Sequence, residues 1–366
     1  MVKKGENIYK RKDKRWEGRY VKGRKENNRI HYGYIYGRSY KEVKEKMLQV
    51  KNSSEPPKIS ASSVYLDTLD QWSQYWFTIL QQRVKQSTFV SYSNKYKHHI
   101  SPYLGQITLV ELTKEDINHW VNKLGQVLTA NSIRAVAQVL RTYLEDSVRA
   151  GVLPSNPYKN IQLPKTELKK VTALTKLEQE RLYNHALNYE QGFAIILALE
   201  TGLRIGELAG LKWEDIDFSD QTIHVRRTIQ RIQNMENTSE KRTIIIETSP
   251  KTHSSKRVIP LSKNMCKRLK NRREAKNGIY VLGGTTPCEP RTISYWFKKI
   301  CQSASLPNIH FHALRHTFAT RCLEEGVTIV TISALLGHHS TKMTLDTYLT
   351  AFLSEKREAI RLVNKR

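Results

Sequence analysis

The sequence is poor in cysteine and in long apolar runs, and each shortage excludes a class of protein. It holds four cysteines, and no two of them form a CxxC pair: Cys266, Cys288, Cys301 and Cys322. Neither a zinc knuckle nor a disulfide framework is therefore predicted. The longest apolar run, FAIILAL over residues 193–199, is far shorter than a membrane span. The residues that follow Met1, VKKGENIYKRKDKR, contain no apolar stretch of the secretory type. We expect a protein of the reducing cytoplasm.

Acidic residues are also scarce relative to basic ones. The 366 residues include 61 Lys and Arg against 34 Asp and Glu, which gives a formal net charge of +27. An excess of this size indicates a polyanionic partner, and without a membrane segment that partner is expected to be nucleic acid. Hydrophobic residues make up 39% of the chain, which is enough to build packed cores. The length is typical of two or three domains.

The first 46 residues interleave aromatic and basic side chains, with 16 basic and 6 acidic residues. RWEGRYV and RIHYGYIYG alternate with period two and predict antiparallel strands, GRKENN predicts a turn, and SYKEVKEKMLQ predicts a helix capped by Ser39. A three-stranded sheet with one helix could lie in a DNA groove. A solvated basic tail is the alternative, but tails rarely carry aromatics at strand spacing. The candidate DNA-binding residues are Arg15, Trp16, Arg19, Tyr20, Tyr32, Tyr34 and Tyr36.

The rest of the chain divides by its composition. Residues 51–63 are rich in Ser and Pro and predict a linker after an N-terminal domain over 1–50. Residues 64–165 predict an all-helical domain of four helices, in which TANSIRAVAQVLRTYLEDSVRAG places an apolar stripe on one face and ends at Gly151. Residues 172–366 predict an α+β domain that is mainly helical, with a small sheet from QTIHVRRTIQRI, KRTIIIETS and KRVIPL.

Four short motifs of the last domain carry the residues suited to chemistry. HALRH, residues 312–316, sets Arg315 between His312 and His316. The other three motifs are TGLRIGEL with Arg204 and Glu207, SPKTHSSKRVIPL with Lys251 in a turn between two strands, and LLGHHSTKMTLDTYL with His338 and Tyr348.

A metal site is one interpretation of the histidines. His312 and His316 are four residues apart, so they share a helix face and could hold zinc. A zinc hydrolase of that type has Glu after the first His, where this chain has Ala313, and Arg315 would bring positive charge towards the cation. We therefore predict no metal. His316 by itself is better explained as a capping or packing residue.

Phosphate chemistry explains more of the set. Arg204 and Arg315 are suited to grip a phosphodiester and to stabilise its extra charge in a transition state. Histidines can hydrogen-bond or shuttle protons near neutral pH, and Lys251 can protonate a departing sugar oxygen. Tyr348 offers a hydroxyl nucleophile that titrates near pH ~10 unless neighbouring cations help it. Singly each residue has a plainer role: Tyr348 could pack, and Arg204 could pair with Glu207 on the surface.

The order and spacing of these residues resemble the tyrosine recombinase, or phage integrase, family. Six positions match the family pattern: Arg204, Lys251, His312, Arg315, His338 and Tyr348. The likeness covers the last ~195 residues, and the helical domain before them fits by position and type. Residues 1–50 resemble the arm-type DNA-binding domain of integrases from conjugative transposons and temperate phages.

The resemblance implies a reaction through a covalent intermediate. Tyr348 attacks the scissile phosphate, forms a 3′-phosphotyrosyl bond and releases a 5′-hydroxyl. Arg204 and Arg315 clamp the non-bridging oxygens, and Lys251 acts as general acid. His312 accepts a proton. By the same resemblance His338 hydrogen-bonds the phosphate and Glu207 supports the arginines.

The resemblance also implies the partners. These are double-stranded DNA with core and arm-type sites, a homotetramer on two duplexes, an excisionase and DNA-bending accessory proteins, with no cofactor and no membrane. The protein would be cytoplasmic and would associate with the nucleoid when bound to DNA. The last helix, SEKREAIRLVNK, resembles the element that docks on a neighbouring subunit, although it could also pack in cis.

Three other functions remain open from the residues. A type IB topoisomerase shares the chemistry, but the arm-like segment and the HALRH and LGHHS motifs argue against it. A chromosome-dimer resolvase usually lacks an arm domain. A non-catalytic DNA-binding regulator would have no need of Tyr348.

Overall fold

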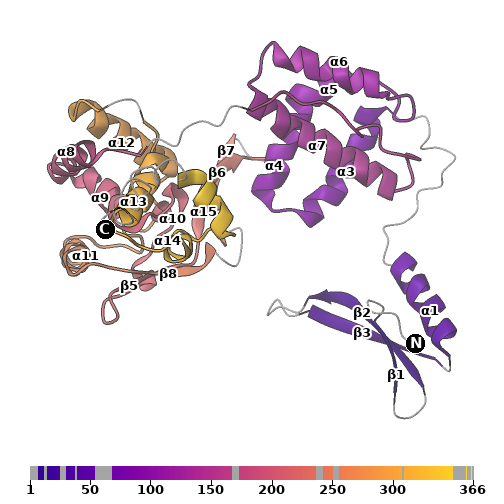
Figure 1. Cartoon of the computed structure of the whole chain (residues 1–366), viewed down its shortest axis with the longest axis horizontal. Coiled ribbons are helices and arrows are strands. Elements are labelled where there is room, and N and C mark those ends of the chain that lie inside the picture. The colour runs from indigo at the N-terminus through magenta and orange to yellow at the C-terminus, as the bar shows by residue number, and fades with distance from the viewer. Residues whose placement is uncertain are drawn as a thin grey trace. The chain divides into compact units, whose positions relative to one another are not determined.

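The computed structural model describes residues 7–11, 15–24, 30–37, 39–53, 68–166, 173–235, 242–249, 255–306 and 309–348, with positions 360 and 364. The chain divides into two compact units, Met1–Thr166 and Glu167–Arg366. Figure 1 shows a small sheet and a helical bundle within the first unit, and a mixed body of helices and short strands in the second. No helix of the described residues is long and apolar enough to cross a membrane.

The N-terminal element is the predicted three-stranded sheet with one helix. Strands β1 (Ile8–Lys10), β2 (Trp16–Arg24) and β3 (Ile30–Gly37) pair antiparallel in that order. Helix α1 (Tyr40–Ser53) follows Ser39, whose hydroxyl accepts a hydrogen bond from the Glu42 amide at 3.1 Å. Val43 is fully buried, and a Cβ on Gly18 would lie 2.7 Å from its Cγ1. Glycine at 18 therefore lets the helix approach the sheet closely.

Helix α1 runs three residues into the segment predicted as a linker, because Lys51, Asn52 and Ser53 are compatible with a helix. The first residues that cannot continue it are Pro56 and Pro57. Positions 54–67 lie outside the described residues.

The helical part of the first unit contains the four predicted helices. Threonine hydroxyls at Thr68, Thr113 and Thr129 cap three of them by accepting backbone N–H groups. The helix that begins at Gln86 changes at Tyr96 from α to a π turn. The elements are α3 (Leu69–Arg83), α4 (Gln86–Lys95), η1 (Tyr96–Ile100), α5 (Ser101–Leu104), α6 (Lys114–Gly125) and α7 (Ala130–Arg149). The core between them is rich in aromatics: Trp72, Trp76, Trp120 and Tyr143 are almost fully buried.

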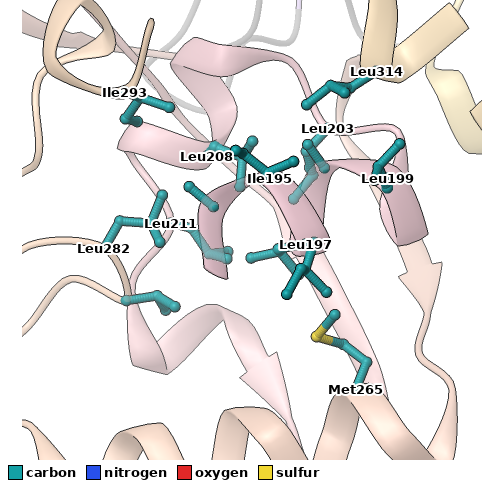
Figure 2. Close-up of a cluster of buried hydrophobic side chains, with 14 of the residues drawn as sticks. Ile195, Leu197, Leu199, Leu203, Leu208, Leu211, Met265, Leu282, Ile293 and Leu314 are labelled. Atoms are coloured by element: carbon teal, nitrogen blue, oxygen red, sulfur yellow. The ribbon is translucent and has the colours of Figure 1, made fainter. Parts of the chain in front are cut away.

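The second unit is built around α9, the helix that contains the longest apolar run of the sequence. Its residues 194–199 are all buried, so α9 runs through the core rather than along the surface. Leu197 is fully buried together with Leu208, Met265 and Leu314, which come from other helices (Figure 2). The helices are α8 (Lys176–Leu187), α9 (Phe193–Thr201), α10 (Ile205–Ala209), α11 (Lys263–Ala275), α12 (Pro290–Ser303), α13 (His312–Glu324), α14 (Ile329–Leu336) and α15 (Thr341–Tyr348).

The strands of this unit form two small sheets. The run QTIHVRRTIQRI, which predicts one strand, is divided at Arg226 and Arg227 into strands of different sheets. Arg227 lies at this division, and its guanidinium pairs with Asp215, Glu214 and Glu247. One sheet has the order β4 (Ile216–Asp217), β5 (Thr222–Val225) and β8 (Arg257–Pro260), and the other pairs β6 (Thr228–Gln233) with β7 (Thr243–Thr248).

Candidate active site

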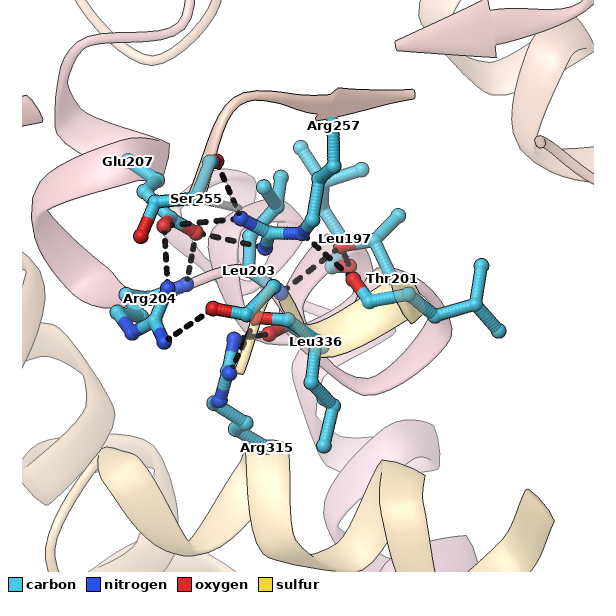
Figure 3. Close-up of polar contacts among 12 residues, drawn as sticks. Leu197, Thr201, Leu203, Arg204, Glu207, Ser255, Arg257, Arg315 and Leu336 are labelled. Carbon is cyan, nitrogen blue, oxygen red and sulfur yellow. Dashed lines mark hydrogen bonds and ion pairs between the residues drawn. The ribbon is translucent and has the colours of Figure 1, made fainter. Parts of the chain in front are cut away.

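Three separate elements, α10, β8 and α13, bring charged residues to one place in the second unit. Arg204 directly precedes α10, and Glu207 lies within it. Arg257 begins β8, and Arg315 lies in the first turn of α13. Helix α13 packs against α9 and α14, so the elements are held around the buried helix. We call Arg204, Glu207, Arg257 and Arg315 the arginine cluster (Figure 3).

Glu207 joins two of the arginines. Its Oε1 accepts from Arg204 Nη1 at 2.8 Å and from Arg257 Nη1 at 3.0 Å. Its Oε2 accepts from the Arg204 backbone N–H at 2.9 Å and from Arg257 Nη2 at 2.8 Å. Burial of this carboxyl would raise its pKa, but the hydrogen bonds and charge of Arg257 and then the charge of Arg204 outweigh burial and lower the pKa of Glu207 to about 2. Glu207 is therefore ionised at any physiological pH.

Three consecutive carbonyls at the end of α14 accept hydrogen bonds from the three arginines. Leu335 O accepts from Arg257 Nε at 2.5 Å, Leu336 O from Arg315 Nη2 at 2.5 Å, and Gly337 O from Arg204 Nη2 at 3.3 Å. Carbonyls in the last turn of a helix have no partner within the helix and carry its negative dipole end. The end of α14 is thus a binding strip for guanidinium groups, and we call these carbonyls the α14 carbonyl strip.

The end of helix α9 also supplies a carbonyl that binds the Arg315 guanidinium. Its Nη1 donates to the carbonyl of Gly202 at 2.9 Å, at the end of α9. Gly202 and Gly337 both cap their helices in the left-handed region, with φ of 63°. Arg315 is only 3% exposed, whereas the Arg204 side chain keeps 35% of its surface. Arg204 is therefore the arginine more open to a ligand.

The two predicted site histidines, His312 and His338, lie beside these arginines, and so does His316. The rings of His312 and His316 meet edge to face, with centroids 4.6 Å apart. His338 follows the α14 carbonyl strip, and its Nδ1 lies 2.7 Å from the hydroxyl of Thr344, which is 1% exposed. Position 348, where α15 ends, follows Thr344 by one helical turn along the backbone.

Burial and the arginines keep the histidines neutral. Burial first, and then the charges of Arg315, Arg204 and Arg257, lower the pKa of His338 to about 4. Burial and the neighbouring His312 and Arg315 lower the pKa of His316 to about 4, which favours a packing role. His312 keeps contact with solvent, but partial desolvation and then the charges of Arg315 and Arg204 lower its pKa as well. Neutral imidazoles can accept a proton as well as donate one.

Two of the predicted residues are not tested by the structure. Lys251 lies in the segment 250–254, between β7 and β8, which is outside the described residues. Tyr348 belongs to α15 by its backbone, but its side chain is outside them too, as is nearly all of the last predicted helix. Within the described part of the chain, no group of three or more His, Cys, Asp or Glu side chains is arranged to hold a metal ion.

The predicted DNA-binding residues of the N-terminal sheet divide between its two faces. Arg19 pairs with Tyr34 across β2 and β3, and residues directly opposite each other share a face. Tyr34 and Tyr36 are 51% and 45% exposed there, and Arg15 is exposed as well. Trp16 instead contacts Tyr40 of α1 edge to face at 5.3 Å, which favours a packing role. The side chains of Tyr20 and Tyr32 lie outside the described residues.

Sequence reasoning missed Arg257. It stands inside the quoted motif SPKTHSSKRVIPL, but it is one of 61 basic residues and has no distinctive spacing from the others. One signal was available, because a charged residue that opens a short apolar strand is expected to need a partner if the strand is buried. The structure supplies that partner in Glu207, fifty residues earlier in the chain.

Comparison with protein-family models gives two matches. Residues 172–354 match the model of the phage integrase family, and residues 68–125 match its N-terminal SAM-like domain. A protein of Caldanaerobacter subterraneus subsp. tengcongensis named tyrosine recombinase XerC-like is 30% identical and covers 93% of this chain and 94% of its own length. The ICEBs1 integrase of Bacillus subtilis is 25% identical over 71% of this chain and 73% of its own.

Solved structures share the fold. The Tn1549 transposon integrase in complex with transposon right end DNA has a TM-score of 0.68, with 22% identity, and covers 81% of this chain and 99% of that one. A lambda integrase tetramer bound to a Holliday junction has a TM-score of 0.59, with 22% identity, and covers 92% of this chain and 96% of that one. The predicted multidomain architecture is confirmed by this likeness.

Proposed function

This chain belongs to the phage integrase family of tyrosine recombinases, enzymes that break and rejoin DNA, and from that premise we propose how its residues act and on what. The arginine cluster is the observation that carries the proposal. It gathers the two predicted catalytic arginines beside His312 and His338, with Arg204 bonded to the Glu207 carboxylate and Arg315 bonded to two helix-end carbonyls. A pair of guanidiniums held in this way suits one phosphate group, since each offers N–H donors in a planar fork.

The reaction divides among the predicted residues as follows. The Tyr348 hydroxyl attacks the phosphorus of the scissile phosphate, its proton passes to His312, and the phosphorus–O5′ bond breaks. Lys251 protonates the departing 5′ oxygen, so the products are a 3′-phosphotyrosyl bond and a free 5′-hydroxyl. Arg204 and Arg315 neutralise the charge that grows on the non-bridging oxygens, and His338 donates a hydrogen bond to one of them. The 5′-hydroxyl of a partner strand then attacks the phosphotyrosine and restores the phosphodiester.

We further propose that the protein integrates and excises a mobile genetic element. The ICEBs1 integrase and the Tn1549 transposon integrase support this choice by their names, and the exposed face around Arg19 and Tyr34 suits a second, arm-type DNA site. The working form is a homotetramer on two duplexes, by analogy with the lambda integrase tetramer. An excisionase and a DNA-bending protein assist it, and the reaction takes place in the cytoplasm.

A suicide substrate tests the proposal. The substrate is double-stranded DNA from the ends of the mobile element, taken from the sequence that flanks the gene, and it carries a nick close to the cleavage site. After cleavage the short fragment with the 5′-hydroxyl is lost, so the covalent intermediate is trapped. We expect a protein–DNA adduct through Tyr348, located by peptide mapping, and no adduct from Tyr348→Phe, which still binds the DNA. An adduct formed by Tyr348→Phe would place the nucleophile elsewhere. EDTA should leave the adduct yield unchanged, and strong inhibition would revive the metal interpretation of His312 and His316.

A chromosome-dimer resolvase is the second candidate, because the relative named XerC-like covers 93% of this chain. Recombination between two identical core sites with no distal site would favour it. Dependence on distal sites favours the integrase. Relaxation of supercoiled DNA without a defined site would favour a topoisomerase.

A further inference from the structure

All three nitrogens of the Arg257 guanidinium donate to protein groups. Its side chain is 5% exposed. Nη1 and Nη2 grip the two oxygens of Glu207 at 3.0 and 2.8 Å, Nη1 also donates to Ser255 O at 3.3 Å, and Nε donates to Leu335 O at 2.5 Å. A guanidinium used in this way is not placed to touch DNA, so any part it has in cleavage must be exerted through its neighbours.

The first of those neighbours is Glu207. Both oxygens of this carboxylate accept hydrogen bonds from Arg257 and from Arg204. Arg204 donates through its side chain and through its backbone N–H. The two-pronged grip of Arg257 holds the carboxylate plane in one orientation. Because Arg204 binds the same two oxygens, that orientation determines where its guanidinium lies. Without Arg257, Glu207 would be free to turn, and Arg204 would turn with it.

The second neighbour is the α14 carbonyl strip. Arg257 binds its first carbonyl, and the next two carbonyls bind Arg315 and Arg204. The residue after the strip is His338. Arg257 therefore shares a set of backbone carbonyls with both arginines proposed to hold the phosphate. The same segment leads directly to His338, which is proposed to donate a hydrogen bond to the phosphate. Figure 3 shows the Arg257 guanidinium beside Glu207, and Arg315 bonded to the Leu336 carbonyl.

We propose that Arg257 is a positioning residue for DNA cleavage: its buried guanidinium sets Glu207, and through it Arg204, and anchors the α14 carbonyl strip that holds Arg315 and precedes His338. This inference rests on the proposed function of Arg204 and Arg315. A purely structural arginine would contribute to folding but would leave the contact between enzyme and phosphate unchanged in each molecule that folds.

The test replaces Arg257 with lysine and with methionine. Lysine keeps the positive charge, so the Arg257→Lys protein should fold, but a single ammonium cannot reproduce the planar fork. Single-turnover formation of the phosphotyrosyl adduct on the suicide substrate, at saturating protein, should slow by about 10- to 100-fold, while the dissociation constant for DNA changes by less than about threefold. Arg257→Met should be slower still if it folds.

A second substrate separates positioning from stability. A methylphosphonate at the scissile position replaces one charged non-bridging oxygen with a methyl group, so cleavage depends less on Arg204. The ratio of wild-type to Arg257→Lys rates should then shrink to within about threefold. Arg321→Met is the matched control, since Arg321 is a largely buried arginine that bonds Gln179 and the Leu174 carbonyl away from the cluster. Any loss that this control shows should be the same on both substrates.

Each result decides one question. A wild-type chain that forms no adduct overturns the proposed function, because the substrate is then not cleaved by the chain at all. If the wild type and Arg257→Lys form the adduct at the same rate, only the proposed role of Arg257 is overturned. A defect of equal size on phosphodiester and methylphosphonate also overturns it, since the loss would then not pass through the charge at the phosphate.

Discussion

Glu207 is the residue on which the balance of charge at the site depends. Its side chain is 4% exposed and faces Arg204 and Arg257, so one buried negative charge is matched against two positive ones. A buried ion pair contributes little over an apolar core, but removal of one partner leaves the other charge unpaired in a poor solvent. Glu207 is therefore expected to matter for stability as well as for cleavage.

Replacement of Glu207 with glutamine should lower the free energy of unfolding by about 3–5 kcal/mol, because two guanidiniums would lose their common counter-charge. Urea denaturation measures this. Glu289→Gln is the control, since Glu289 pairs with Arg231 where both side chains are partly open to solvent, 28% and 34% exposed. The control should lose no more than about 1 kcal/mol. Equal losses in the two variants would contradict the account of Glu207.

The histidines predict a pH dependence of stability. A lowered pKa in the folded state means that the unfolded chain binds the proton more tightly, so unfolding is favoured as the pH falls below the ordinary value of 6.5. For His338 and His316 this loss should develop from about pH 6.5 down to about pH 4. Glu207 adds a separate loss only below its ordinary pKa of 4.5.

Urea denaturation of the wild type and of His338→Gln between pH 8 and pH 5 measures the histidine contribution. The variant should lose less stability over this interval, because one of the groups that must take up a proton is gone. Parallel curves would show that His338 titrates in the folded chain as it does in the unfolded one.

At the scale of elements, the site depends on how two helices end. Helices α9 and α14 both stop at a glycine with φ of 63°, and the carbonyls that are left over bind Arg315 and Arg204. The left-handed conformation turns the chain away from the helix axis and leaves the terminal carbonyls accessible. The sequences TGLR and LLGHH each place a helix stop one or two residues from a site residue.

Gly202→Ala should therefore damage both stability and cleavage. A Cβ at this position would suffer the left-handed strain of about 1–2 kcal/mol and would also lie 2.6 Å from Cδ1 of Phe318. Gly326→Ala is the control in the same unit, because Gly326 has φ of 76° but no atom within 4 Å of the added Cβ. Thermal unfolding should show a larger loss for Gly202→Ala, and adduct formation should slow only in that variant. An equal effect in both would mean that strain alone matters.

The sequence predicted these elements better than it predicted their pairing. The cap at Ser39, the apolar stripe of α7 and the stop at Gly151 are all local features, and the helices followed them. The division of β5 from β6 was not predicted, because the two strands pair with different partners, β8 and β7, and a local pattern does not specify strand pairing. The π turn at Tyr96 has no signal in the periodicity.

At the scale of the whole molecule, the charge of +27 predicts a steep dependence of DNA affinity on salt. Contacts to phosphates release counterions, so the logarithm of the affinity falls linearly with the logarithm of the salt concentration, with a slope of about −0.9 per contact on duplex DNA. Residues 1–46 carry 16 of the basic residues. Binding titrations from 50 to 200 mM salt should give a steeper slope for the full chain than for a chain without residues 1–50.

Deletion of residues 1–50 also tests the two DNA sites. The shortened protein should still form the covalent adduct at core sites, because the arginine cluster lies wholly in the second unit. It should lose binding to distal sites, measured by footprinting. Distal binding that survives the deletion would show that the exposed face around Arg19 and Tyr34 is not the arm-binding surface.

Local sequence features predicted which residue types this protein could use and where several of its helices and turns would lie. Those properties depend on neighbours a few positions apart, such as a serine cap, a period of 3.6 or a glycine stop. The contact between Arg257 and Glu207, and the three arginines bound at one helix end, appear only in the folded chain. These contacts join residues 21 or more positions apart and arise from the packing of α9, α13, α14 and β8 around one core, and a linear pattern does not encode the distances that such packing sets.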